Sequence, residues 1–213
     1  MTELITVLLV DDHAIVREGY RRLLAEQPAV RVVGEATTAP EACELALRLR
    51  PDVVVMDIAL PGMSGIEATR RMLKSAAAPR VLMFSMHEDA IYATRALQAG
   101  AMGYLSKASA PEVLMSAIFA VQRGERYLSP DVAANMDHAT QPEHSAEFAL
   151  LTPREFEVLR LLVQGETVRS IGKKLGVSQK KTIANHQSAI REKLGARNSL
   201  QLSRLAEYHG LRP

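Results

Sequence analysis

Acidic, hydroxyl and basic side chains follow the short apolar runs in the first half of the sequence. Asp11 and Asp12 come directly after the first apolar run, and Asp57 comes after the third. Ser85 ends the fourth run, and Lys107 stands at the end of the fifth. Three carboxylates that met in one crevice would repel each other and lose hydration. A hard divalent cation relieves this, and Mg²⁺ favours a few carboxylates together with water.

These five side chains together suit the transfer of a phosphoryl group to a carboxylate. Asp57 would be the nucleophile, while Mg²⁺ and Lys107 would neutralise phosphoryl oxygens and Ser85 would donate a hydrogen bond to another. A single acid after a strand is more often a helix cap, so the prediction depends on the five residues occurring together.

Apolar runs alternate with amphipathic stretches over roughly the first 125 residues, which is typical of βαβ units around a parallel sheet. The expected strands are residues 5–10, 31–35, 53–56, 81–84 and 103–105, and the expected helices are 14–27, 39–50, 65–75, 89–99 and 111–123. Ligands bind at the carboxyl ends of parallel strands. The acids, the hydroxyl and the ammonium should therefore meet at one edge of the sheet.

The sequence changes character after residue 124. Residues 125–149 are polar without clear periodicity, and we expect a linker there with a short helix near 130–136. From residue 150 the pattern is helical throughout. It begins with the capping box Thr152-Pro153-Arg154-Glu155. The expected organisation is therefore a domain at 1–124, a linker at 125–149 and a second domain at 150–213.

Charge is distributed unevenly along a chain whose net charge is +2. Residues 149–213 hold 12 Lys and Arg against 5 Asp and Glu, whereas the preceding residues hold 14 against 19. A short helix at about 168–175, a turn near Gly176 and a longer helix make a helix-turn-helix candidate. The basic side chains around it are suited to phosphate contacts. They are Lys173, Lys174, Lys180, Lys181, Arg191, Lys193 and Arg197.

Cellular location is predicted from features that the sequence lacks. The only cysteine, Cys43, excludes an intrachain disulfide and favours a reducing compartment, where we expect it to be a small buried side chain. No apolar run approaches the ~18 residues that a membrane span needs. The first run is too short for a signal peptide and has no basic flank. We expect a cytoplasmic protein with no membrane partner.

Four motifs resemble the receiver domains of two-component response regulators over residues 4–123. They are Val10–His13, Met56–Gly65, Phe84-Ser85 and Gly103–Lys107. The resemblance implies a doubly wound, flavodoxin-like α/β fold with five parallel strands in the order 2-1-3-4-5, and a sensor histidine kinase that phosphorylates Asp57. It also implies metal ligation by Asp12 and Asp57, by Asp11 largely through water, and by the backbone carbonyl of Ala59.

The receiver resemblance also implies a signal path. Ser85 would move toward the phosphoryl group and Tyr104 would change rotamer; an ordinary half-buried tyrosine is the alternative. Ala59 and His87 occupy positions that influence hydrolysis of the aspartyl phosphate in this family. Because Ala59 cannot hold a water, we hypothesise that His87 orients one; a surface histidine without this role is the alternative.

Residues 150–210 resemble the LuxR-type DNA-binding domain of the NarL/FixJ regulators. The segments Leu151–Leu159 and Leu194–Asn198 carry the resemblance. It implies a small all-α, four-helix domain whose third helix, about 180–194, enters the major groove of double-stranded DNA. Ala184, Asn185 and Ser188 would face the bases. Thr182, His186 and the lysines would face the backbone.

Two departures from the LuxR pattern affect these assignments. Ser178 and Thr182 are four residues apart where the family usually has three, which puts the numbering of the base contacts in doubt by one position. We expect the extra residue to be absorbed before Thr182, since an insertion inside the helix would rotate all later side chains by ~100°. Gly172 stands where the family has alanine, and glycine weakens a helix unless it allows close packing.

Several other functions compete with this interpretation. A small-molecule phosphatase with an aspartate nucleophile should carry a second acid where Ala59 stands, and a dinucleotide-binding enzyme should carry G-x-G-x-x-G after the first strand. A receiver that acts through protein contacts alone does not need the basic C-terminal helices. We therefore predict a transcription regulator, not a dedicated enzyme, that forms a homodimer when phosphorylated. A DNA-binding regulator that is largely independent of phosphorylation is the alternative.

Overall fold

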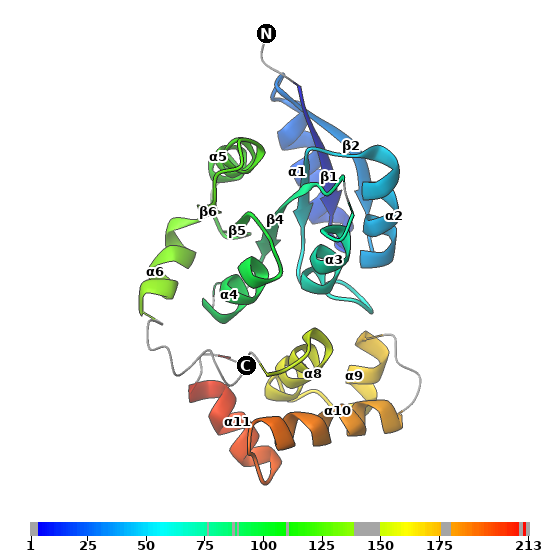
Figure 1. Ribbon diagram of the computed structural model, residues 1–213, viewed down its shortest axis with the longest axis vertical. Helices are drawn as coiled ribbons and strands as arrows, with labels where there is room; N and C mark the ends of the chain where they lie inside the picture. Colours follow the sequence, from blue (N-terminus) through cyan, green and yellow to red (C-terminus); the bar gives the residue numbers. More distant parts are fainter. Residues whose placement is uncertain are drawn as a thin grey trace. The chain divides into compact units, whose positions relative to one another are not determined.

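The computed structural model describes residues 4–75, 77–86, 88, 90–109, 111–138, 150–175, 180–208 and 211. The chain divides into two compact units (Figure 1). The first comprises residues 1–88 and 92–134, and the second comprises residues 89–91 and 135–213. Within the described residues, no helix combines the length and the apolar composition needed to cross a membrane.

The first unit is built on a parallel sheet of six strands in the order β2-β1-β3-β4-β5-β6. The strands are β1 (Ile5–Val10), β2 (Val30–Ala36), β3 (Val53–Met56), β4 (Arg80–Ser85), β5 (Gly103–Ser106) and β6 (Tyr127–Leu128). The expected order of the first five strands is confirmed, but the expected total of five is wrong. The sixth strand has only two residues, too few for the alternation that identifies a strand in a sequence.

Among the described residues up to 138, six helices accompany these strands. They are α1 (Ala14–Ala25), α2 (Ala39–Leu49), α3 (Gly65–Met72), α4 (Ala90–Gln98), α5 (Pro111–Gln122) and α6 (Pro130–His138). The segment 125–149, expected to be a linker, begins with β6 and α6, which follow each other directly. The short helix expected near 130–136 is therefore present.

Helices cover both faces of the sheet, as its continuously apolar central strands require. One face, which includes Val55 and Phe84, packs with Leu24 of α1 and Ile118 of α5 in a single buried cluster. On the other face Met83 accepts a hydrogen bond from Thr69 of α3. This doubly covered sheet fixes the positions of the loops at its carboxyl edge.

Cys43 lies on α2, with its thiol 3.9 Å from the carbonyl oxygen of Ala68 in α3. Its side chain is half-buried, where full burial was expected. Burial raises the pKa of this thiol, which disfavours the reactive thiolate.

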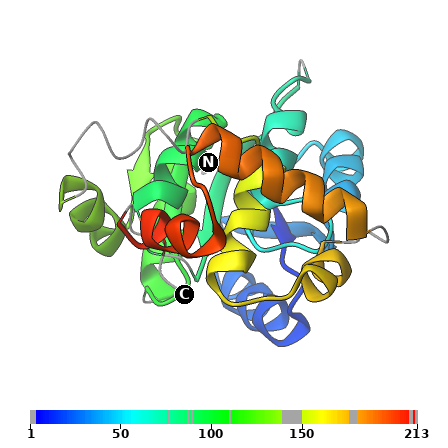
Figure 2. The same cartoon turned by 90° about the horizontal axis from the view of Figure 1, so that it is seen from below.

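From residue 150 on, the described residues form four helices around their own core. They are α8 (Pro153–Val163), α9 (Val168–Lys174), α10 (Lys180–Lys193) and α11 (Ser199–Tyr208). The predicted capping box is confirmed: Thr152 and Glu155 each satisfy a backbone N–H at the start of α8. Figure 2 shows α10 in orange lying across α8 and α9. The contact buries Ile171, Ile183 and Ile190 completely.

Candidate functional site

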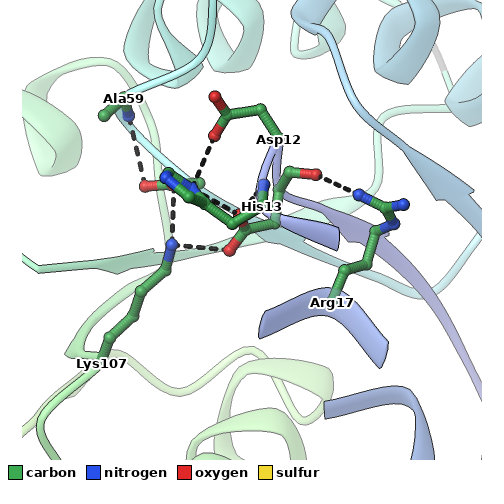
Figure 3. Close-up of polar contacts among 7 residues, drawn as sticks. Asp12, His13, Arg17, Ala59 and Lys107 are labelled. Atoms are coloured by element: carbon green, nitrogen blue, oxygen red, sulfur yellow. Dashed lines mark hydrogen bonds and ion pairs between the residues drawn. The ribbon is translucent and has the colours of Figure 1, made fainter. Parts of the chain in front are cut away.

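The carboxyl ends of β1, β3 and β5 bring two of the predicted acids onto one lysine (Figure 3). The ammonium Nζ of Lys107 lies 2.6 Å from Oδ2 of Asp11 and 2.7 Å from Oδ2 of Asp57. The backbone N–H of Lys107 donates to the carbonyl of Ser85 at the end of β4. Four strand ends are therefore joined at one edge of the sheet, as the sequence predicts.

Burial makes these charges strongly dependent on one another. The side chains of Lys107, Asp11 and Asp57 are 5%, 9% and 4% exposed. Burial raises the pKa of Asp57, and the positive charge of Lys107 opposes that rise. Burial would lower the pKa of Lys107, but Asp57 and Asp11 outweigh it and raise the pKa above its usual value. We conclude that the lysine stays charged and favours the ionised form of Asp57.

Asp12 completes the predicted carboxylate group, and His13 joins it. Ligand atoms of Asp11, Asp12, His13 and Asp57 all lie within 4.8 Å of one another. The Nδ1 atom of His13 lies 2.9 Å from Oδ1 of Asp12, and the backbone N–H of His13 donates to Oδ1 of Asp11. Three carboxylates converging on one point form a donor set that fits a hard divalent cation.

The loop after β3 positions the Asp57 carboxylate. The N–H of Ala59 donates to Oδ1 of Asp57 at 3.2 Å, while Lys107 holds Oδ2. The N–H of Asp57 itself donates to the carbonyl of Val10 in β1. Gly65 begins α3 against this loop, where an added Cβ would lie 2.0 Å from the carbonyl oxygen of Asp57. The main chain of Asp57 is thus fixed on both sides.

Sequence reasoning assigned no role to two side chains near this cluster. His13 directly follows the two acids, and a histidine at that position could have been predicted as a further metal ligand. No sequence pattern indicates a role for Arg17, because one turn of α1 separates it from the acids. Its Nη1 donates to the carbonyl of Asp11 at 2.7 Å and its Nε to Glu35 at 2.9 Å. Arg17 therefore ties the end of β1 to β2.

The predicted switch residues lie in the neighbouring strands. Ser85 and Tyr104 are both fully buried, so the half-buried tyrosine considered from the sequence is not what the structure contains. Tyr104 pairs with Met83 in the parallel register, and Ser85 pairs with Ser106. The histidine at position 87, proposed to orient a water, lies outside the described residues.

The exposed face of α10 carries the residues predicted to face DNA bases. Ile183 and Ile190 are buried in the core, whereas Ala184, Asn185 and Ser188 are exposed. The helix is continuous from Lys180 to Lys193. Residues 176–179, which include the turn serine, lie outside the described residues.

The predicted basic residues differ in their partners. Lys173 and Arg197 are exposed, and Arg191 is partly buried with a long hydrogen bond to Ser188. Lys174 forms an ion pair with Glu166, and Lys193 forms one with Glu155. Thr182 and His186 are partly buried. The side chains of Lys180 and Lys181 are outside the described part of the chain.

Two family models match the chain. The response regulator receiver domain matches residues 7–119, and the bacterial regulatory proteins of the luxR family match residues 149–206. The response regulator UvrY of Escherichia coli is 38% identical, and the response regulator GacA of Pseudomonas aeruginosa is also 38% identical. Each alignment covers 98% of this chain, together with 96% of UvrY and 98% of GacA.

Solved structures resemble the chain as well. A LuxR-family response regulator from Aurantimonas is 47% identical with a TM-score of 0.62, over 64% of this chain and 97% of that one. RcsB of Salmonella enterica, bound to the promoter rprA with the phosphomimetic BeF₃⁻, is 25% identical with a TM-score of 0.67. The match covers 96% of this chain and 99% of the RcsB chain. The motifs, the fold and these matches agree. The chain belongs to the two-component response regulators of the NarL/FixJ family, which combine a receiver domain with a LuxR-type DNA-binding domain.

Proposed function

We propose that phosphorylation of Asp57 by a sensor histidine kinase controls sequence-specific DNA binding and transcription by this protein. The observation that carries the proposal is the buried Lys107 ammonium held between Asp11 and Asp57. A purely structural cap would not need three converging carboxylates and a buried cation at the edge of a parallel sheet. We propose a receiver domain at 1–124, a connecting segment at 125–149 whose first strand, β6, joins the receiver sheet, and a DNA-binding domain at 150–213.

The carboxylates of Asp11, Asp12 and Asp57 and the backbone carbonyl of Ala59 would hold Mg²⁺. The clustered oxygens of the three carboxylates support this assignment, because Mg²⁺ prefers a few carboxylates together with water. When bound, Mg²⁺ supplies positive charge that offsets the phosphoryl oxygens. His13 offers a nitrogen donor, which Mg²⁺ prefers less than oxygen.

The Asp57 carboxylate is the nucleophile. One of its oxygens bonds to phosphorus as the bond from phosphorus to the kinase's phosphohistidine nitrogen breaks, and that nitrogen keeps the electron pair. Lys107 neutralises a phosphoryl oxygen, and the Ser85 hydroxyl donates to another. The rearrangement of Ser85 and Tyr104 then carries the signal. The protein accepts and slowly loses the phosphoryl group, so it is not a dedicated enzyme.

The second unit is the output. Ala184, Asn185 and Ser188 contact base edges in the major groove, where asparagine can pair with adenine and alanine can touch a thymine methyl. Apart from Lys193, which pairs with Glu155, the other predicted DNA-facing residues contact phosphates and set the register. A phosphorylated homodimer reads two half-sites and gains from linking the two contacts. Because the protein acts on the bacterial chromosome, we place it in the cytoplasm.

Phosphoryl uptake can be measured directly by intact-protein mass spectrometry after incubation with acetyl phosphate. The wild-type chain should gain one phosphoryl group in the presence of Mg²⁺ and none when EDTA removes the metal. The Asp57→Asn variant should gain none in either condition. Uptake by that variant at the wild-type level would refute the assignment of Asp57.

A further inference from the structure

The first turn of α8 contacts both helices of the helix-turn-helix. A guanidinium nitrogen of Arg154 donates to the carbonyl of Leu175 at the C-terminal end of α9. The carboxylate of Glu155, one residue further, accepts from Nζ of Lys193 at the C-terminal end of α10 at 2.6 Å. We propose that Arg154 and Glu155 form a positioning clamp for the recognition helix, and that Lys193 anchors this helix and is not primarily a phosphate contact. This inference rests on the proposed DNA-binding function.

The Glu155 end of the clamp is well shielded from water. Its side chain is 8% exposed, while that of Lys193 is 34% exposed. The same oxygen, Oε2, accepts from the N–H of Thr152 at 2.7 Å, so the helix cap and the ion pair share one atom. A shielded carboxylate that loses its partner is destabilising. The lysine is therefore held in place by the cap of α8 and not only by its own helix.

The Arg154 end acts on the helix that precedes the recognition helix. The last carbonyls of a helix have no partner within that helix, and a basic side chain can satisfy one of them and interacts favourably with the helix dipole. Leu175 is the residue that caps α9, immediately before the connection to α10. Arg154 and Glu155 therefore fix the two helices at their C-terminal ends from one rigid turn.

This arrangement bears on where the base-facing side chains point. Ile183 and Ile190 hold one side of α10 in the core, and Lys193 holds its end. Asn185 lies eight residues before Lys193, about 12 Å along the helix axis. Without the ion pair, the end of α10 would be free to tilt or rotate, and the position of Asn185 relative to a base edge would change. Contacts to phosphates tolerate such shifts better, because they need less exact geometry.

The salt dependence of DNA binding distinguishes the two roles considered for Lys193, an anchor of α10 and a contact to a DNA phosphate. Binding of the full-length chain would be measured over a range of salt concentrations, after treatment with acetyl phosphate and Mg²⁺. One probe is a labelled duplex that the wild-type chain selects from a random-sequence pool, and the other is the same duplex with its sequence shuffled. Lys193→Gln, Lys193→Arg and Lys173→Gln would be compared, the last as a matched change at an exposed lysine.

Lys193→Gln should bind the selected duplex about tenfold more weakly, with little change on the shuffled duplex and no change in the salt slope. Lys193→Arg should restore most of that loss. Lys173→Gln should instead lower the slope by roughly 0.9 and weaken binding to both duplexes alike. If Lys193→Gln behaves like Lys173→Gln, or has no effect on either duplex, the clamp is wrong.

A measurement without DNA keeps the clamp testable even if the proposed function fails. Glu155→Gln, Lys193→Gln and the double variant form a cycle in thermal unfolding of the full-length chain. The double variant should lose less stability than the sum of the two single variants. Additive losses would contradict the clamp. A wild-type chain that binds no duplex, together with clear coupling in this cycle, would contradict only the DNA-binding function.

Discussion

Asp57 and Lys107, 50 positions apart in the sequence, are joined by a 2.7 Å contact between Oδ2 and Nζ. The same ammonium also donates to Asp11, so a single buried cation contacts two carboxylates. Burial raises the pKa of Asp57, and the Lys107 ammonium opposes that rise and so favours the ionised carboxylate that a nucleophile must be. The other oxygen of this carboxylate, Oδ1, accepts from the backbone N–H of Ala59.

Gly65→Ala should damage the loop that carries Asp57. The new Cβ would lie 2.0 Å from the carbonyl oxygen of Asp57, a backbone atom that cannot move aside cheaply. We expect a loss of about 2 kcal/mol in the free energy of unfolding, measured by chemical denaturation, together with slower phosphoryl uptake. Gly19→Ala is the matched control, because it lies inside α1 with no atom within 4 Å of the new Cβ. It should stabilise the chain by about 0.5 kcal/mol. Equal effects of the two variants would contradict the expectation.

Asp12→Ala should weaken Mg²⁺ binding at least about tenfold, because it removes one of three carboxylate donors. Isothermal titration calorimetry measures the affinity, and acetyl phosphate labelling should slow in parallel at low Mg²⁺. Glu26→Gln removes an exposed carboxylate at the other end of α1 and should bind Mg²⁺ as the wild type does. Wild-type affinity in Asp12→Ala would exclude this residue from the metal site.

Asn185→Ala and Ile183→Ala should separate recognition from folding. The Asn185 side chain is exposed, so its loss should leave the thermal midpoint unchanged and reduce discrimination against shuffled DNA by about tenfold or more. Ile183 is fully buried, and its truncation should cost about 3 kcal/mol of stability. If Asn185→Ala kept the wild-type specificity, Asn185 would not contact a base, and other residues of α10 would have to be assigned to base contacts.

Acid should weaken the pairing of Glu155 with Lys193. Burial would raise the pKa of Glu155, but the hydrogen bonds from Lys193 and Thr152 outweigh it and hold the pKa below 4.5. The stabilisation is therefore fully present above about pH 4.5 and is lost as the pH falls through the folded-state value. Amide hydrogen exchange measures the free energy of opening of α8 and α10. The difference in this free energy between the wild type and Glu155→Gln should become smaller as the pH falls. The difference from Glu192→Gln, an exposed change on α10, should stay small throughout. If the stability difference between the wild type and Glu155→Gln grew as the pH fell, the ionised form of Glu155 would not be the stabilising one.

Local patterns predicted most of the fold and much of the site. The apolar runs identified five strands, and their ends correctly brought Asp11, Asp57 and Lys107 to one edge. Strand β6 was missed because two residues carry no periodicity. Glu155 was recognised only as a helix cap, because its pairing with Lys193 depends on how α8 and α10 cross. Crossing is set by side-chain packing, which spacing in the sequence does not encode.

The central claim is that the phosphorylation state of Asp57 sets DNA affinity. It is tested most directly by fluorescence anisotropy on the selected duplex, with the full-length chain in Mg²⁺, before and after acetyl phosphate. The wild type should bind at least about tenfold more tightly after treatment, within the usual range of coupling between two sites. Asp57→Asn should bind with one unchanged affinity in both conditions. Equal affinities for treated and untreated wild type, despite phosphoryl uptake seen by mass spectrometry, would contradict the account and favour a regulator that acts independently of phosphorylation.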